Sequence, residues 1–193
     1  MASEFSVVTA ATTALVTTAE AKALLNIDHS ADDTLIAALV AAATEEAQRA
    51  CARSFITRTC RLVLHRWPCD NVIRLQYPPA LTVTSIKYYD ADGVEQTVDA
   101  ADYTVITDVT PGIVVPAVNK AWPTASLRTY APIRVTYTAG YGAAAANVDA
   151  DLVALVKALV VVDYESRESI SSQAQAQRDR LINALQARWG WAE

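Results

Sequence analysis

Residues 151–165 read DLVALVKALVVVDYE, and this stretch decides how the two ends of the chain fold. From Leu152 to Val162 nearly every side chain is apolar, with Lys157 as the exception. With Asn147 and Asp149 available as caps before it, the run predicts an α-helix from near Asp151 to near position 167. A helix that is apolar all round is buried on all sides. In a chain of 193 residues, one way to bury it is against another subunit.

The N-terminal part of the chain predicts two more helices after an extended arm. Residues 1–17 are mostly small and β-branched without a helical period, and they form the arm. Segment 18–56 is helical, because Thr17 and Glu20 make a capping box for a short helix, and Ser30 with Asp33 opens a longer one that ends near Ala52. The apolar residues of the longer helix follow a 3.6-residue period: Leu35, Ile36, Leu39, Val40, Ala43 and Ala47.

Segment 57–145 has no helical period and predicts an inserted antiparallel β module. Short β-branched or aromatic runs alternate with turn residues, and all 7 prolines of the chain lie at run ends or between runs. The loop from Asp90 to Gly93 joins two runs as a hairpin. The expected strands are Thr59–Trp67, Val72–Leu75, Thr82–Tyr89, Val94–Val98, Tyr103–Ile106, Ile113–Val115 and Ile133–Thr138.

The chain then returns to helix in segment 146–168, and residues 169–193 predict an amphipathic tail helix. Leu181, Ile182, Leu185 and Trp189 lie on one face of this last helix. That face suits the groove of a neighbouring protein or, equally, the subunit's own core. The fold class is therefore α+β: an antiparallel helical bundle built from both chain ends, with the antiparallel β module inserted between them.

Composition restricts the possible functions. Hydrophobic residues make up 52% of the chain, enough to bury a core, and the formal net charge of −5 argues against a protein that binds nucleic acid by neutralising phosphates. The longest apolar run is well below the roughly 20 residues that span a bilayer, and no signal peptide is evident. Cys51, Cys60 and Cys69 are an odd number of cysteines, which favours free thiols in a reducing compartment.

No motif of a catalytic, metal or cofactor site stands out. His29 and His65 have no Ser, Cys or second His at a catalytic or ligand spacing, and the cysteines lack the close pairs of zinc sites. The Asp90–Gly93 loop is expected to be a turn rather than a calcium loop. Glu165 and Glu168 could act as a hydrolase pair, but their spacing favours a surface ion network.

Two functions of different classes remain possible beside a structural role. One is the hydrolase just described. The other is a non-catalytic β-module binding protein that recognises a carbohydrate or a surface, in which Trp67, Trp122 and Tyr141 form a stacking platform.

An ordered series of short motifs spans residues 18–168. The motifs are Glu20–Leu25, Asp32–Ile36, Cys51–Thr59, Arg66–Pro68, Ile73–Leu75, Pro78–Pro79, Val83–Asp90 with the Asp92–Gly93 turn, Trp122–Pro123, Val135–Gly142 and Tyr164–Glu168. In this order and spacing the chain resembles the head–tail connector (adaptor) proteins of tailed bacteriophages, in the longer form also found in prophages and gene transfer agents. It departs from that family in having Asp149 where a Pro is frequent, and in its longer tail.

The resemblance implies a structural protein without enzymatic activity or cofactor. It would form a homo-oligomeric ring, typically of twelve subunits, beneath the portal protein and above a tail-proximal neck or stopper protein. Double-stranded DNA would pass through the ring without sequence-specific binding, and the ring would be a virion component assembled in the bacterial cytoplasm, with no membrane partner. The candidate interface residues lie in the apolar third helix and the tail: Leu152, Leu155, Val156, Leu159, Val160, Tyr164, Arg167, Leu181, Leu185, Trp189 and Trp191.

Overall fold

The computed structural model describes residues 3–166 and 172–190 and divides the chain into two compact units. Residues 1–11 and 57–140 form the first, here called the β unit. Residues 12–56 and 141–193 form the second, called the helical unit. Residues 57–140, the larger part of the β unit, are thus inserted between the two halves of the helical unit, as the sequence predicts, and the α+β fold class is confirmed.

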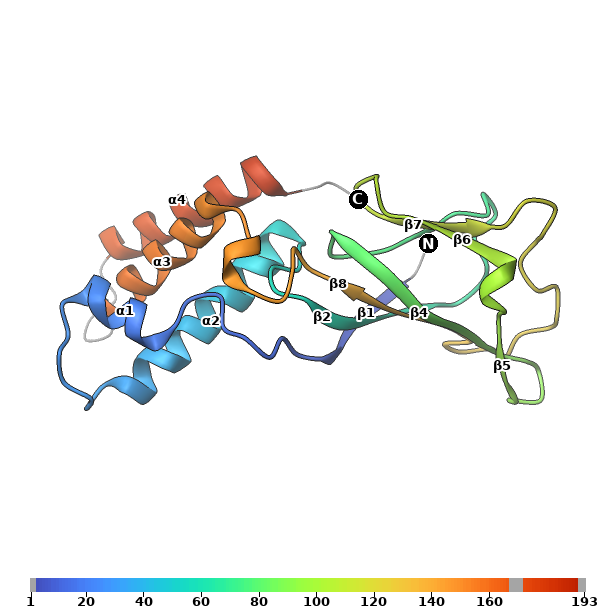
Figure 1. Ribbon diagram of the computed structural model, residues 1–193, viewed down its shortest axis with the longest axis horizontal. Coiled ribbons are helices and arrows are strands. Elements are labelled where there is room, and N and C mark those ends of the chain that lie inside the picture. Colours follow the sequence, from blue (N-terminus) through green and yellow to red (C-terminus); the bar gives the residue numbers. More distant parts are fainter. Residues whose placement is uncertain (1–2, 167–171, 191–193) are drawn as a thin grey trace. The chain divides into compact units, whose positions relative to one another are not determined.

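Four α-helices build the described part of the helical unit (Figure 1). They are α1 (Thr18–Leu25), α2 (Asp33–Cys51), α3 (Ala150–Glu165) and α4 (Ser172–Trp189), and a short 3-10 turn, η2 (Ala145–Asn147), precedes α3. Helix α3 packs against α1, α2 and α4, and α2 also packs against α1 and α4. The core therefore lies where α2 and α3 meet.

Helix ends follow the local sequence closely. The backbone N–H of Glu20 donates to Thr17 Oγ1 at 3.2 Å, and the Thr17 N–H donates to Glu20 Oε2 at 2.9 Å, which completes the expected capping box of α1. Asp149 caps α3 by accepting from the Asp151 N–H at 3.0 Å. The start of α2 differs from the expectation, because its N-cap residue is Asp32 and no side-chain cap bond forms there.

Eight strands form two antiparallel sheets in the described part of the β unit. The five-stranded sheet has the order β1-β2-β8-β4-β5, and the three-stranded sheet has the order β3-β7-β6. The strand bounds are β1 (Ser3–Thr9), β2 (Arg58–Leu64), β3 (Ile73–Arg74), β4 (Ala80–Tyr89), β5 (Glu95–Thr97), β6 (Tyr103–Ile106), β7 (Ile113–Pro116) and β8 (Ile133–Ala139).

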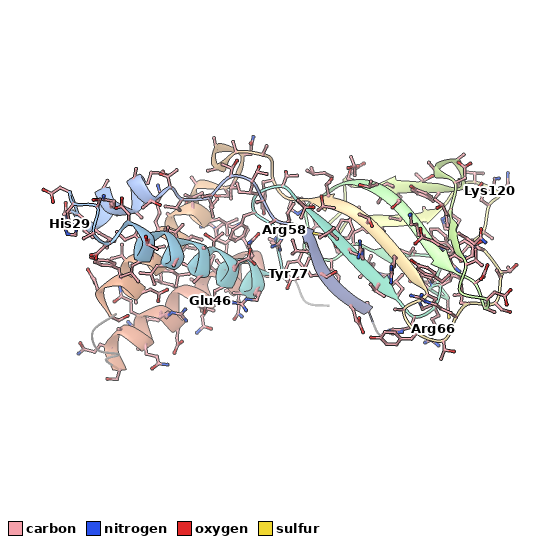
Figure 2. All side chains as sticks on the ribbon, turned by 90° about the horizontal axis from the view of Figure 1, so that it is seen from below. His29, Glu46, Arg58, Arg66, Tyr77 and Lys120 are labelled. Atoms are coloured by element: carbon pink, nitrogen blue, oxygen red, sulfur yellow. The ribbon has the colours of Figure 1, made fainter. Side chains whose placement is uncertain are left out.

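The inner face of the five-stranded sheet carries the core of the β unit. Side chains alternate between buried and half-buried along β2 and β8, as a sheet with one covered face requires. Tyr137, the largest fully buried side chain among the described residues, donates its hydroxyl to the Gln76 carbonyl at 2.6 Å. Arg58, also on the inner face, lies with its guanidinium carbon 5.5 Å from the ring centroid of Tyr77 (Figure 2).

The hairpin between β4 and β5 has the expected turn. The Gly93 N–H donates to the Asp90 carbonyl at 3.0 Å, and Gly93 has φ +80°, a conformation that favours glycine. The Asp90 carboxylate accepts from the backbone N–H groups of Asp92 and Val94 at 3.1 and 2.9 Å. Its oxygens therefore serve the turn itself.

The boundaries of the units differ from the expected ones at two places. Residues 3–9 are a strand, β1, whose Ser3 lies opposite Leu64 and whose Val7 lies opposite Cys60. The sequence reveals the extended backbone of this segment, but the partner strand is more than fifty residues away and gives no local signal. The helical unit resumes at Tyr141 rather than 146, because the Tyr141 N–H donates to the Phe55 carbonyl at 2.8 Å.

Candidate functional site

Helix α3 carries most of the interface residues expected from the sequence. Leu152, Val156, Leu159, Val160 and Tyr164 are buried, each with at most 8% of its surface exposed, and α1, α2 and α4 account for this burial within one subunit. The apolar character all round α3 therefore has an explanation inside the helical unit. Leu155 is half-buried and still offers surface to another molecule.

Polar contacts fix the C-terminal end of α3. The Tyr164 hydroxyl donates to Asp32 Oδ2 at 2.6 Å, which joins α3 to the start of α2. Arg178 of α4 donates from Nε to Asp163 Oδ1 at 2.8 Å and from both terminal nitrogens to the Glu46 carboxylate, with Nη1 to Oε1 at 2.8 Å. These contacts raise the pKa of the Arg178 guanidinium, with Glu46 as the larger cause. One arginine thus connects α2, α3 and α4.

The tail helix α4 uses part of its apolar face inside the helical unit. Leu185 is fully buried, whereas Leu181 and Trp189 are half-buried. The Arg53 Nε donates to the Trp189 carbonyl at 2.7 Å, and the guanidinium carbon of Arg188 lies 4.4 Å from the Trp189 ring centroid. The centre of this apolar face is therefore buried in the subunit's own core. Two of the expected interface residues, Arg167 and Trp191, lie outside the described residues.

An open hollow of about 400 Å³ lies beside α3 in the helical unit. Its α3 wall consists of a row at helical spacing, Ala150, Val153, Ala154 and Lys157. Lys157 Nζ donates to Glu20 Oε1 at 3.0 Å at the rim. The remaining lining residues are Leu15, Ala145, Ala146 and Val148. Small side chains on both walls leave room for another chain to approach α3 closely.

The pKa of Glu20 falls from its ordinary value to about 2. The hydrogen bonds from the backbone and side chain of Thr17 are the main cause, and the bond from Lys157 adds to them. Because each of these bonds favours the ionised carboxylate, the cap of α1 and its contact with α3 both depend on the charge of Glu20.

The titratable side chains of the described residues do not assemble into a metal site. In residues 3–166 and 172–190, no group of three His, Cys, Asp or Glu side chains could hold a metal ion. His29 is exposed in the turn between α1 and α2, and His65 Nε2 lies 3.9 Å from Glu4 Oε1. Burial raises the pKa of the Cys51 thiol to about 11, which leaves it protonated near neutral pH. Of the proposed hydrolase pair, Glu165 is exposed and Glu168 lies outside the described residues.

The two tryptophans of the aromatic platform considered for a carbohydrate pack against each other. Trp67 and Trp122 stack on each other with ring centroids 4.9 Å apart, and Trp122 is only 6% exposed. The Trp122 indole N–H donates to the Asn71 carbonyl at 3.2 Å. Tyr141, the third expected member, belongs to the helical unit. The two tryptophans therefore close the core of the β unit.

Sequence reasoning missed the outer face of the five-stranded sheet. Arg61 of β2, Arg134 of β8 and Lys87 of β4 all point away from the core, since each alternates with a buried neighbour. Lys87 lies directly opposite Arg134 across the strand pair. A single charged residue at an outward position of each strand is visible in the sequence. Which strands stand side by side is not, and the three cations meet only in the sheet.

Within the described ranges, the longest and most apolar helices still fall short of what crossing a bilayer requires. No curated protein matches the chain. Residues 16–108 match the family described as phage gp6-like head-tail connector protein, a stretch that begins before α1 and continues through β6.

Solved structures similar to the chain come from gene transfer agent (GTA) particles. A chain of the virion of a native GTA particle has a TM-score of 0.78 and 25% identity, over 98% of this chain and 96% of that one. A chain of the native particle's neck, computed with C12 symmetry, has a TM-score of 0.74 and 26% identity over the same shares, 98% and 96%. A chain of an empty particle's neck, computed with C6 symmetry, has a TM-score of 0.75 and 25% identity over 92% and 94%.

The similarity to these chains covers both units and nearly the whole length of each chain, so the order of helices and inserted β strands along the chain is shared. The family match and the ordered motifs lead to the same family. The chain is thus similar to the phage gp6-like head–tail connector family over residues 16–108, and to chains of gene transfer agent particles over nearly its whole length.

Proposed function

We propose that the chain is a structural, non-enzymatic subunit of the head–tail neck and assembles into a ring of twelve copies beneath the portal protein. The observation that carries this proposal is the similarity, over 98% of the chain, to a chain of a particle neck computed with C12 symmetry. In this position the ring completes the DNA exit channel after packaging. Its lower surface receives the tail-proximal neck or stopper protein.

The surface of α3 supports a role in ring contacts. The hollow beside α3 has the small side chains Ala150 and Ala154 on its wall, so a neighbouring segment can come close to the helix backbone. Leu155, Leu181 and Trp189 remain half-buried and can be covered further on assembly. We assign one of the ring contacts to these residues, while the buried side chains of α3 hold the helix in place.

The charge of the chain supports a channel that does not hold its DNA. A formal net charge of −5 gives no general attraction for phosphates, and a ring of twelve copies repeats that charge around the channel. Double-stranded DNA then passes without sequence-specific binding. The carbohydrate-binding alternative receives no such support, because two of its three aromatic rings, Trp67 and Trp122, pack against each other in the β unit.

Electron microscopy of the chain with its cognate portal, and separately alone, tests the proposal. The expected result is a closed ring seated on the portal, and weak self-association without it. Single particles that never bind the portal, at any protein concentration tested, would contradict it. A sedimentation measurement on the same samples distinguishes unassembled chains from rings that fail to attach.

A further inference from the structure

The two units of the chain differ sharply in charge. The β unit contains eight Lys and Arg and eight Asp and Glu, so its formal net charge is zero. The helical unit contains eight Lys and Arg and thirteen Asp and Glu, and it therefore carries the whole net charge of −5. Within each unit the charges are also unevenly placed, which gives the chain one basic face and one acidic end.

The basic face is the outer face of the five-stranded sheet. Its cations are Arg61, Lys87 and Arg134, on the neighbouring strands β2, β4 and β8, which lie side by side in Figure 2. Arg61 pairs across with Thr136, two positions from Arg134, so the two guanidinium groups start from diagonal neighbours in the sheet. The acidic residues of this face are Glu4 of β1, opposite Val63, and Glu95 of β5. The rest is largely hydroxyl-bearing: Ser6, Thr59, Thr82, Ser85, Thr136 and Thr138.

Two features of this face are unfavourable within the subunit. Lys87 and Arg134 are directly opposite each other, and like charges in such a pair destabilise a sheet. Glu95 of β5 offsets only part of this, by accepting from Lys87 Nζ at 2.6 Å. Arg61 makes no hydrogen bond or ion pair with any described residue. Arg61 is therefore ready to meet a carboxylate of another molecule.

Aromatic contacts hold part of the face in a fixed arrangement. Arg134 Nη1 donates to the Tyr89 hydroxyl at 3.0 Å, and its guanidinium carbon lies 4.9 Å from the Tyr89 ring centroid. Arg128 stacks on the same ring at 3.8 Å. Since these side chains are already ordered, binding loses less conformational entropy, and Tyr with Arg is a pairing common at protein interfaces.

The acidic end of the helical unit lies where the α1–α2 turn meets the end of α3. The Tyr164–Asp32 hydrogen bond joins these two segments, and Asp28, Asp33, Asp163 and Glu165 also belong to them. Asp33 is paired with Lys22 and Asp163 with Arg178. Asp28 and Glu165 are exposed and have no hydrogen bond or ion pair among the described residues.

We propose that the outer face of the five-stranded sheet docks on the acidic end of the helical unit of a second copy of this chain. This contact rests on the proposed ring, because a ring of identical copies needs two different surfaces that fit head to tail. Opposite charges on one basic face and one acidic end meet that need. They also fix the direction in which the copies follow one another.

The size of the face explains why the contact belongs to a ring and not to a dimer. Five strands about 4.8 Å apart, with about seven residues of roughly 3.4 Å each, give a face of about 550 Å². A stable pairwise interface buries about 800 Å² on each partner. One such contact is therefore weak in solution and becomes effective when the portal aligns many copies.

Charge reversal on each surface, and on both together, tests the contact. The face variant carries Arg61→Glu and Lys87→Glu, and the acid variant carries Asp28→Lys and Glu165→Lys. Assembly on the cognate portal is followed by electron microscopy, and the chain concentration at half-assembly is measured from 50 to 300 mM salt. We expect each double variant to need at least roughly tenfold more protein, because like charges then face each other. The chain with all four substitutions should assemble again.

The control variant carries Arg74→Glu and Lys120→Glu, which change the net charge by the same amount away from this face, and it should assemble like the wild type. Circular dichroism and urea unfolding establish that every variant folds. A face variant that assembles normally overturns the proposed contact and leaves the ring proposal intact. A chain with all four substitutions that stays unassembled has the same consequence. If the face variant forms normal rings that retain DNA less well, the proposed contact is overturned and the sheet face is a DNA-facing surface. A wild-type chain that never assembles overturns both proposals.

Discussion

Leu159→Ala in α3 is expected to destabilise the subunit strongly. Leu159 is fully buried where α3 meets its neighbouring helices. The substitution removes three carbon atoms, which costs about 2.4 kcal/mol of transfer free energy at roughly 0.8 kcal/mol per methylene. The cavity left behind raises the loss to about 3–4 kcal/mol. This loss is a large part of the free energy of unfolding of a typical domain, which is roughly 5–15 kcal/mol.

Leu155→Ala provides the matched comparison in the same helix. Leu155 is half-buried, so the same truncation loses about half of the transfer free energy and leaves no closed cavity, about 1 kcal/mol in all. Urea unfolding of both variants, followed by circular dichroism at 222 nm, compares the two losses. Equal losses, or a smaller loss for Leu159→Ala, would refute the assignment of α3 to the subunit's own core. Leu155→Ala is expected to weaken ring assembly more than stability.

Three further outcomes follow from individual side chains. Thr17→Ala should lower the free energy of unfolding by about 1 kcal/mol through the lost cap. Because the folded pKa of Glu20 is about 2, below its ordinary value, the stability that Glu20 contributes is present above about pH 4.5 and is lost as the pH falls toward 2. An acid titration of both proteins should therefore show a smaller loss of stability in the variant. A thiol reagent at pH 8 should modify Cys69, which is exposed, in the native protein, and leave Cys51, with its raised pKa, unmodified until urea unfolds the chain; equal rates would contradict the burial. Tyr164→Phe should cost about 0.5–1.5 kcal/mol by removing the hydroxyl that donates across the helices, and a thermal shift of zero would show that this bond is unimportant.

Local chemistry in the sequence was enough to predict the helices and most strands. The Thr17–Glu20 spacing encodes its own cap, and strand Tyr103–Ile106 has the bounds that its β-branched run predicts. The Asp90–Gly93 turn also formed as expected, because Asp and Gly satisfy its backbone without help from distant residues. These features depend on residues no more than a few positions apart.

Features that depend on distant pairing could not be predicted in this way. Residues 3–9 become a strand only because β2 presents a free edge to them. Leu185 and Trp189 form an apolar face whatever they contact, and only the packing of α4 on α2 and α3 shows that Leu185 closes the subunit's own core. The basic face is of the same kind, since Lys87 and Arg134 are neighbours across two strands far apart in the sequence.

The central claim is that this chain forms a neck ring beneath the portal, and a cryo-electron microscopy reconstruction of the assembled portal complex tests it most directly. The account predicts twelve copies of the chain around the channel, each with both units resolved and each in contact with its two neighbours. A reconstruction in which the chain is absent from the neck, or is bound as isolated copies without a closed ring, would contradict it.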